Sequence, residues 1–158
     1  MNKFLRKFIF VTMALILTSC SYKPIFSEKE FNFQINDVKF YGEKDINKII
    51  KNKLDLIKKN DYGTNRTYNL SIVTSQKKLI VSKDSKGNPL KFEMSIVVNY
   101  EVKKDGKILF KKDIEKNNIY NSNTDKFELE KKEKIILENI SDKISEIIIS
   151  SLINLDDN

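Results

Sequence analysis

The sequence predicts an α+β fold in which two helices pack on one face of a four-stranded, mostly antiparallel sheet, in the order β-α-β-β-β-α. Three observations lead to this fold class. Apolar residues recur at spacings of three and four in two segments, as in amphipathic helices. Other segments alternate apolar and polar residues, as in strands with one face on the core and one in water. An Asp-Gly pair at residues 105–106 joins two of these strands and is a strong hairpin signal.

The first strand and the first helix follow a short irregular segment that carries Pro24. Residues 33–41 alternate well enough for a strand, which ends at Gly42. Residues 45–59 are predicted to form a helix with a lysine-rich outer face, followed by a loop over residues 60–65. The apolar stripe of this helix consists of Ile46, Ile49, Ile50, Leu54 and Ile57.

Three more strands are expected next. One runs from Tyr68 to about residue 81, and residues 83–89 form a turn. The clearest alternation in the chain covers residues 90–103, and its partner strand covers residues 108–120. The side chains of this pair that are predicted to face the core are Leu90, Phe92, Met94, Ile96, Val98, Tyr100, Val102, Ile108, Phe110 and Ile114.

A final helix is expected over residues 125–153, after a polar segment at residues 121–124 that is able to cap it. Acidic side chains in its first turns, such as Asp125 and Glu128, suit the positive end of the helix dipole. Its apolar stripe includes Leu129, Ile136, Ile140, Ile144, Ile147, Ile148 and Leu152. Packing of this helix on the one-sided sheet completes a single core.

The first 20 residues have the organisation of a bacterial export signal. Lys3, Arg6 and Lys7 precede an apolar run at residues 8–17. A helix needs about 20 apolar residues to cross a bilayer, so this run has instead the length of the hydrophobic part of a signal peptide. The Leu-Thr-Ser-Cys motif that ends at Cys20 resembles a lipobox. We therefore expect cleavage before Cys20 and lipid attachment to its thiol.

These features predict three parts of the chain. Residues 1–19 form the lipoprotein signal peptide, residues 20–32 a lipidated tether, and residues 33–158 a single α+β domain that faces the periplasm. Two or more acyl chains attach a protein lastingly to a membrane. Ser21 replaces the aspartate that retains enteric lipoproteins in the inner membrane, which favours the outer membrane. The alternative is a free cysteine at the end of an ordinary cleavable signal.

The composition argues against catalysis and against nucleic-acid binding. Three of the 29 basic side chains lie in the signal, which leaves 26 against 22 acidic side chains, a net charge of +4. Nearly all of them are lysines, whereas nucleic-acid-binding proteins concentrate arginine on one face. The chain has no histidine and one cysteine, so the commonest general base and transition-metal ligand are missing. We expect no enzyme activity, no cofactor, no metal and no nucleic-acid partner.

One group of carboxylates is a candidate acid site. Glu128, Glu130 and Glu133 lie close together in the sequence of the predicted final helix. Their interleaving with lysines is more typical of a solvated helix face. No glycine-rich phosphate loop and no nucleophile motif is present.

Two surfaces are candidates for binding. Lys77, Lys78 and Lys83, together with Gln76 and Lys86, form a basic patch at one end of the predicted sheet. Lysines bind phosphate groups as point charges. A lysine-rich background is the alternative explanation of this patch. The polar face of the sheet is the second candidate, because it suits water but also the polar interior of a large outer-membrane barrel.

Several motifs resemble a known family. Residues 20–26, Cys-Ser-Tyr-Lys-Pro-Ile-Phe, are similar to the opening motif of the alphaproteobacterial LPS-assembly lipoproteins, the LptE family. The likeness continues with a Tyr-x-Leu strand at residues 68–70, Asn-Tyr at 99–100, the Asp-Gly pair at 105–106 and the segment 119–122. These motifs occur in the same order as in the family and span nearly all of the chain after the signal.

The resemblance implies a lipid-anchored plug and assembly partner inside the large LptD-like barrel that inserts lipopolysaccharide into the outer leaflet. It also implies contact with lipopolysaccharide through basic residues. Lys77, Lys78 and Lys83 are assigned to that contact from their chemistry, because no family motif aligns with them. Ser21 and Ile119 replace the family's usual glycine and serine. The alternatives are an auxiliary lipoprotein of a lipid-trafficking ABC transporter and an activator of a cell-wall synthase.

Overall fold

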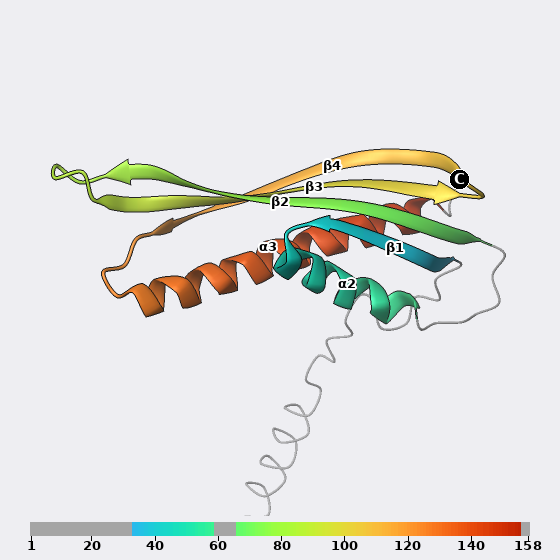
Figure 1. Ribbon diagram of the computed structural model, residues 1–158, viewed down its shortest axis with the longest axis horizontal. Helices are drawn as coiled ribbons and strands as arrows, with labels where there is room; N and C mark the ends of the chain where they lie inside the picture. The colour runs from blue at the N-terminus through green and yellow to red at the C-terminus, as the bar shows by residue number, and fades with distance from the viewer. Residues whose placement is uncertain (1–32, 59–65, 156–158) are drawn as a thin grey trace, which may run out of the picture.

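The computed structural model describes residues 33–58 and 66–155, which form six elements in the predicted order (Figure 1). The predicted fold class is confirmed. The predicted signal peptide and the tether with Cys20 lie outside the described residues. The elements are β1 (Gln34–Gly42), α2 (Lys44–Lys58), β2 (Thr67–Lys83), β3 (Pro89–Lys104), β4 (Lys107–Asn121) and α3 (Lys126–Asn154).

The four strands form one sheet in the order β1-β2-β3-β4. β1 runs parallel to β2, whereas β2, β3 and β4 are joined by hairpins and pair antiparallel. The parallel pair follows from the connection, because α2 carries the chain back to the start of the sheet before β2 begins. Both helices lie on the same face of the sheet in Figure 1, which leaves the other face uncovered.

The core lies between the two helices and the inner face of the sheet. Ile72, Val98 and Ile144 have no exposed surface. Among the described residues, no helix combines the length and apolarity that a membrane span requires. The buried residues that the helical and strand patterns predicted are Ile46, Ile50, Leu54, Ile57, Met94, Ile96, Val98, Tyr100, Val102, Ile114, Ile136, Ile140, Ile144, Ile148 and Leu152.

Two residues that were predicted to face the core, Leu90 and Ile108, are instead 50% and 48% exposed. Leu90 lies at the far end of the β2–β3 hairpin, beyond the cover of the helices. The pairing of β3 with β4 shifts between Val102 and Lys103, so Ile108 lies opposite Lys103. Because a one-residue shift moves a side chain to the other face of a sheet, the alternation predicted the wrong face for Ile108.

The cap of α3 also differs from the prediction. Asp125 caps the helix, rather than the polar segment at residues 121–124. Its carboxylate accepts hydrogen bonds from the backbone N–H groups of Phe127 at 2.9 Å and Glu128 at 3.3 Å. An N-cap side chain of this kind satisfies N–H groups that have no partner inside the helix.

β1 ends at a tightly packed junction, where Gly42 lies against β2 and the chain continues into α2. Gly42 has a φ of +91°, and a Cβ there would lie 1.9 Å from the carbonyl oxygen of Thr74. The buried hydroxyl of Thr74 accepts a hydrogen bond from the N–H of Glu43 at 2.9 Å and donates to the side-chain oxygen of Asn47 at 2.8 Å. These contacts turn the chain out of the sheet into α2. β1 therefore pairs with β2 only as far as Thr74.

Candidate functional site: the tip of the β2–β3 hairpin

β2 and β3 continue past the end of β1 as a long hairpin, which forms the left-hand end of the molecule in Figure 1. We call residues 77–93 the hairpin tip. The Asp84 carboxylate holds its turn by accepting hydrogen bonds from the backbone N–H groups of Lys86 at 2.9 Å and Asn88 at 2.8 Å. The side-chain amide of Asn88 donates to it as well, at 2.9 Å, and this bond is the main cause that lowers the pKa of Asp84.

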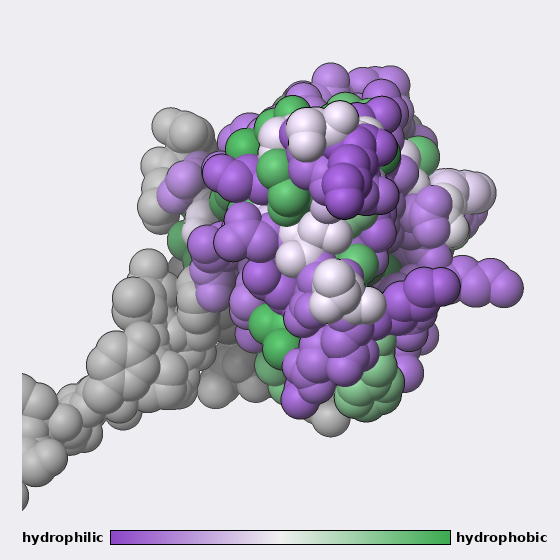
Figure 2. Space-filling model, turned by 90° about the vertical axis from the view of Figure 1, so that its left-hand side faces the viewer, coloured by the Kyte–Doolittle hydropathy of each residue, from purple (hydrophilic) through white to green (hydrophobic). Residues whose placement is uncertain are grey.

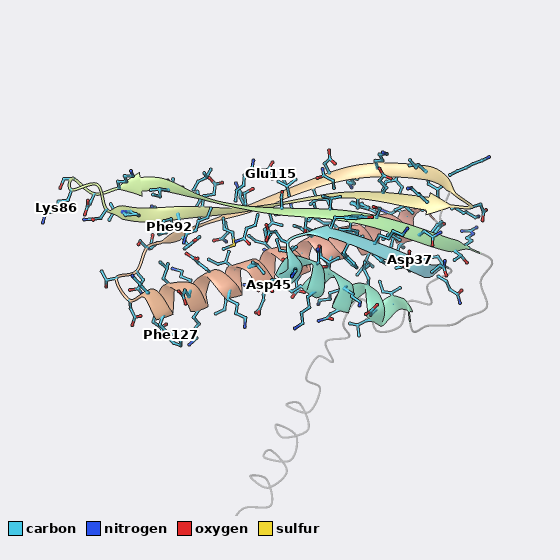
Figure 3. All side chains as sticks on the ribbon, in the orientation of Figure 1. Asp37, Asp45, Lys86, Phe92, Glu115 and Phe127 are labelled. Carbon is cyan, nitrogen blue, oxygen red and sulfur yellow. The ribbon has the colours of Figure 1, made fainter. Side chains whose placement is uncertain are left out.

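The hairpin tip exposes apolar side chains among lysines. Leu79, Ile80, Val81 and Leu90 are between 47% and 58% exposed. Figure 2 faces this end and shows hydrophobic residues interspersed with hydrophilic ones. The exposed lysines of the tip are Lys77, Lys78, Lys83, Lys86 and Lys91. Lys86 lies at the extreme end of the hairpin in Figure 3.

The three predicted lysines all lie at the tip, but they do not form one cluster. Lys77 and Lys78 are consecutive strand residues, so their side chains point to opposite faces of the sheet. Lys78 lies on the helix side, where its Nζ is 2.6 Å from Oε1 of Glu133 and 4.4 Å from the centre of the Phe92 ring. Lys77 and Lys83 are exposed and are the two better placed to meet a ligand.

Glu133, on α3, contacts the tip through Lys78 and contacts β4 through Tyr120. The hydroxyl of Tyr120 donates to its carboxylate at 2.8 Å. Burial raises the pKa of Tyr120 above its ordinary value, and the neighbouring carboxylate raises it further. Glu128 and Glu130 are exposed and lie two residues apart on α3, so their side chains do not face each other and the three carboxylates do not converge on one site. In residues 33–58 and 66–155, no group of three or more His, Cys, Asp or Glu side chains is arranged to hold a metal ion.

Sequence reasoning found the charge of the tip but missed its exposed apolar part. The signal was present, because Leu79, Ile80 and Val81 are consecutive apolar residues that break the strand alternation. The structure explains the break as a bulge. The pairing moves from Ile80 opposite Phe92 to Ser82 opposite Lys91, which leaves Val81 as the extra residue.

The uncovered face of the sheet is polar, as the alternation predicted. Its side chains pair across the strands: Asn99 donates to Asp113 at 2.6 Å, and Ser95 donates to Glu115 at 3.0 Å. Glu115 points away from the helices in Figure 3. This face therefore satisfies many of its polar groups within the sheet itself.

No protein-family model and no curated protein matches this chain. Solved structures do share its fold. The rare lipoprotein B from Shewanella oneidensis is 19% identical, with a TM-score of 0.55, over 77% of this chain and 99% of that one. A minor lipoprotein from Acinetobacter baumannii is 12% identical, with a TM-score of 0.54, over 78% and 95%. The uncharacterized lipoprotein B from Nitrosomonas europaea is also 12% identical, with a TM-score of 0.54, over 80% and 88%. At these identities the likeness establishes a fold, and that fold is one found in bacterial lipoproteins.

Proposed function

We propose that this protein is an outer-membrane lipoprotein that acts as plug and assembly partner of the large β-barrel that inserts lipopolysaccharide into the outer leaflet. The observation that carries this proposal is the hairpin tip, where lysines surround half-exposed apolar side chains. Lipopolysaccharide carries both phosphate groups and acyl chains. A surface that contacts it needs cations for the phosphates and apolar area for the chains.

The lysines of the tip have different tasks in this proposal. Lys77, Lys83 and Lys86 are exposed and contact phosphate. Lys78 is held by Glu133 and lies over Phe92, so it fixes the tip against α3 instead. This division revises the assignment of Lys77, Lys78 and Lys83 as one set.

Two further features support the proposal. The polar face of the sheet, with its cross-strand pairs such as Asn99 with Asp113, suits the polar lumen of a barrel. The lipobox-like motif at Cys20 and the fold shared with bacterial lipoproteins agree with attachment to a membrane by an N-terminal lipid. In this arrangement the protein faces the periplasm, and it carries no catalytic role.

Affinity isolation of the full-length, lipidated protein in detergent tests the proposed partner. The expected result is an outer-membrane barrel of several hundred residues that co-purifies with it, and the Cys20→Ala variant serves as the unlipidated control. Recovery with an inner-membrane ABC transporter or with a cell-wall synthase would favour one of the two alternatives. Recovery only as a free monomer would count against all three.

A lysine-replacement series tests the contact with lipopolysaccharide. The variant Lys77→Gln/Lys83→Gln/Lys86→Gln should bind purified lipopolysaccharide more weakly, and the remaining binding should depend less on salt. A control removes the same charge from exposed lysines elsewhere: Lys39→Gln/Lys51→Gln/Lys107→Gln. Equal weakening in the two variants would mean that net charge, and not the hairpin tip, attracts the lipid.

A further inference from the structure

We infer that the free edge of β4 and the groove beside it accept an extended segment of a partner polypeptide, with an acidic residue at every second position, as a fifth strand of the sheet. This inference does not rest on the proposed function, because it uses neither the hairpin tip nor the lipid anchor. It rests on three observations: the open edge of β4, the groove between β4 and α3, and the lysines that line this groove.

β4 is the outermost strand of the sheet and is 15 residues long. It pairs with β3 along nearly its whole length, and no other strand among the described residues pairs with its second edge. Figure 1 shows β4 along the border of the sheet. About half of the backbone N–H and C=O groups of an edge strand point outward, where an added strand is able to bond them.

A groove of about 900 Å³ runs between β4 and α3. On the β4 side, Lys112 and Lys116 line it, and both are exposed although they lie on the face that the helices cover. Ile114 between them is only 5% exposed. α3 therefore covers the inner face of β4 only in part. The apolar side chains that line the groove come from α3: Ile136, Ile140 and Ile147.

The charges of the groove indicate an acidic occupant. Lys112, Lys116 and Lys143 line it together with one carboxylate, that of Glu146. Successive side chains of a strand point to opposite faces, so a strand beside β4 with an acidic residue at every second position is able to place all of its acidic side chains on the helix-covered face, near Lys112 and Lys116. A second copy of this chain fits poorly, because pairing two β4 edges would bring Lys112 and Lys116 of both copies close together. The same lysines discourage self-association and favour an acidic strand.

The dimensions of the groove suit a short segment. From Lys112 to Asn118, β4 is about 20 Å long, at about 3.3 Å per residue. The lining of the groove on α3 extends from Ile136 to Asn154, about 27 Å at 1.5 Å per residue. An extended segment of about 6–8 residues matches both lengths.

Hydrogen–deuterium exchange on the full-length protein in detergent tests the inference with two octapeptides, one alternating valine with glutamate and one alternating valine with lysine. The acidic peptide should slow amide exchange in residues 107–121, and the basic peptide should not. In Lys112→Glu/Lys116→Glu, the acidic peptide should bind on the order of tenfold more weakly and the basic peptide should now bind. Binding of the basic peptide by this variant would show that the variant is folded. The control variant Lys39→Glu/Lys51→Glu should bind both peptides as the unchanged protein does.

Three results with the peptides would overturn the inference. One is unchanged exchange of β4 with the acidic peptide, and another is equal protection by both peptides. The third is equal binding of an acidic peptide with prolines in place of its valines, because proline has no N–H to donate to the edge. Decanoate, an anionic amphiphile, tests the groove as a lipid site. Protection by decanoate without protection by the acidic peptide would replace the peptide with a lipid and also overturn the inference.

Discussion

The tip of the β2–β3 hairpin and its body, which is the rest of the two strands (residues 67–76 and 94–104), are built from the same strands. The body contributes to the core, whereas the side chains of the tip are largely exposed. Ile72 in the body has no exposed surface, whereas Ile80, on the same face of the same strand, is 48% exposed. The difference lies in what covers the strand. β1 ends opposite Thr74, where the chain turns into α2. Alternation therefore decides which face a side chain occupies, and neighbouring elements decide whether that face is buried.

The largest expected difference comes from truncating one apolar side chain in each region. Ile72→Ala should lower the free energy of unfolding by about 2–5 kcal/mol, because it leaves a cavity in a closed core. Ile80→Ala should lower it by less than about 1 kcal/mol, since water already reaches that side chain. Denaturant unfolding measures both values. Similar losses would mean that the tip is as well covered in solution as the body.

Two glycines provide a second comparison at nearly the same backbone angle. Gly42 and Gly87 have φ values of +91° and +88°, but a Cβ on Gly87 meets no atom within 4 Å. Gly87→Ala should cost about 1 kcal/mol from the positive φ alone. Gly42→Ala should cost more than about 2 kcal/mol, because a Cβ would also clash with the backbone of Thr74. Thermal unfolding checks the order, and equal costs would contradict the crowding at the β1 junction.

Alkaline pH should weaken the contact between β4 and α3. The neutral phenol of Tyr120 is the native form, and its pKa is raised by burial and by Glu133. In the unfolded chain a tyrosine ionises near pH 10. The stabilisation is therefore complete below about pH 10, and it is lost above that pH by up to about 1.4 kcal/mol per pH unit. Tyr120→Phe should remove this part of the decrease in the free energy of unfolding with pH. Tyr41 is exposed, so the control variant Tyr41→Phe should keep it.

Neutralising Glu133 should have a smaller effect. Glu133→Gln removes the ion pair with Lys78 but still leaves an oxygen for the hydroxyl of Tyr120. We expect a loss of about 1 kcal/mol or less at neutral pH, because Lys78 is partly solvated. Glu130→Gln, on an exposed face of α3, is the control. Local hydrogen exchange in the tip should increase only in the first variant.

The smallest expected effect is that of the tip lysines on stability. Lys83→Gln and Lys86→Gln should change the free energy of unfolding by less than about 0.5 kcal/mol, because both side chains are exposed. Chemical denaturation of each variant measures this. A large change would assign these lysines to the fold and remove the reason to assign them to a ligand.

The features that the sequence predicted correctly are local ones. The Asp-Gly turn forms because Asp105 and Gly106 adopt φ values of +50° and +77°, which that dipeptide tolerates. The stripes of the two helices follow from side-chain spacing alone. The same patterns could not locate bulges. The register shift beside Ile108 and the extra residue Val81 depend on how one strand lies against another.

The candidate site was predictable only in part, for a similar reason. The sequence shows the run of lysines, but it does not show which of them are free to bind a ligand. Lys78 forms an ion pair with Glu133, which lies on a helix far away in the sequence. The groove beside Lys112 and Lys116 was not predicted at all. Its presence depends on the position of α3 beneath the sheet, which side-chain periodicity does not specify.

The sequence by itself determined the order of the elements, the face that the strands present to the core away from their bulges, and the lipobox-like motif at Cys20. These depend on spacing over a few residues, which local sterics and hydrophobicity control. Only the tertiary structure decided where the sheet loses its cover, which lysines remain exposed and which edge stays open. Those features depend on contacts between segments far apart in the chain. One such contact is that of Gly42 with the backbone of Thr74, because β1 ends there and β2 continues without it toward the hairpin tip.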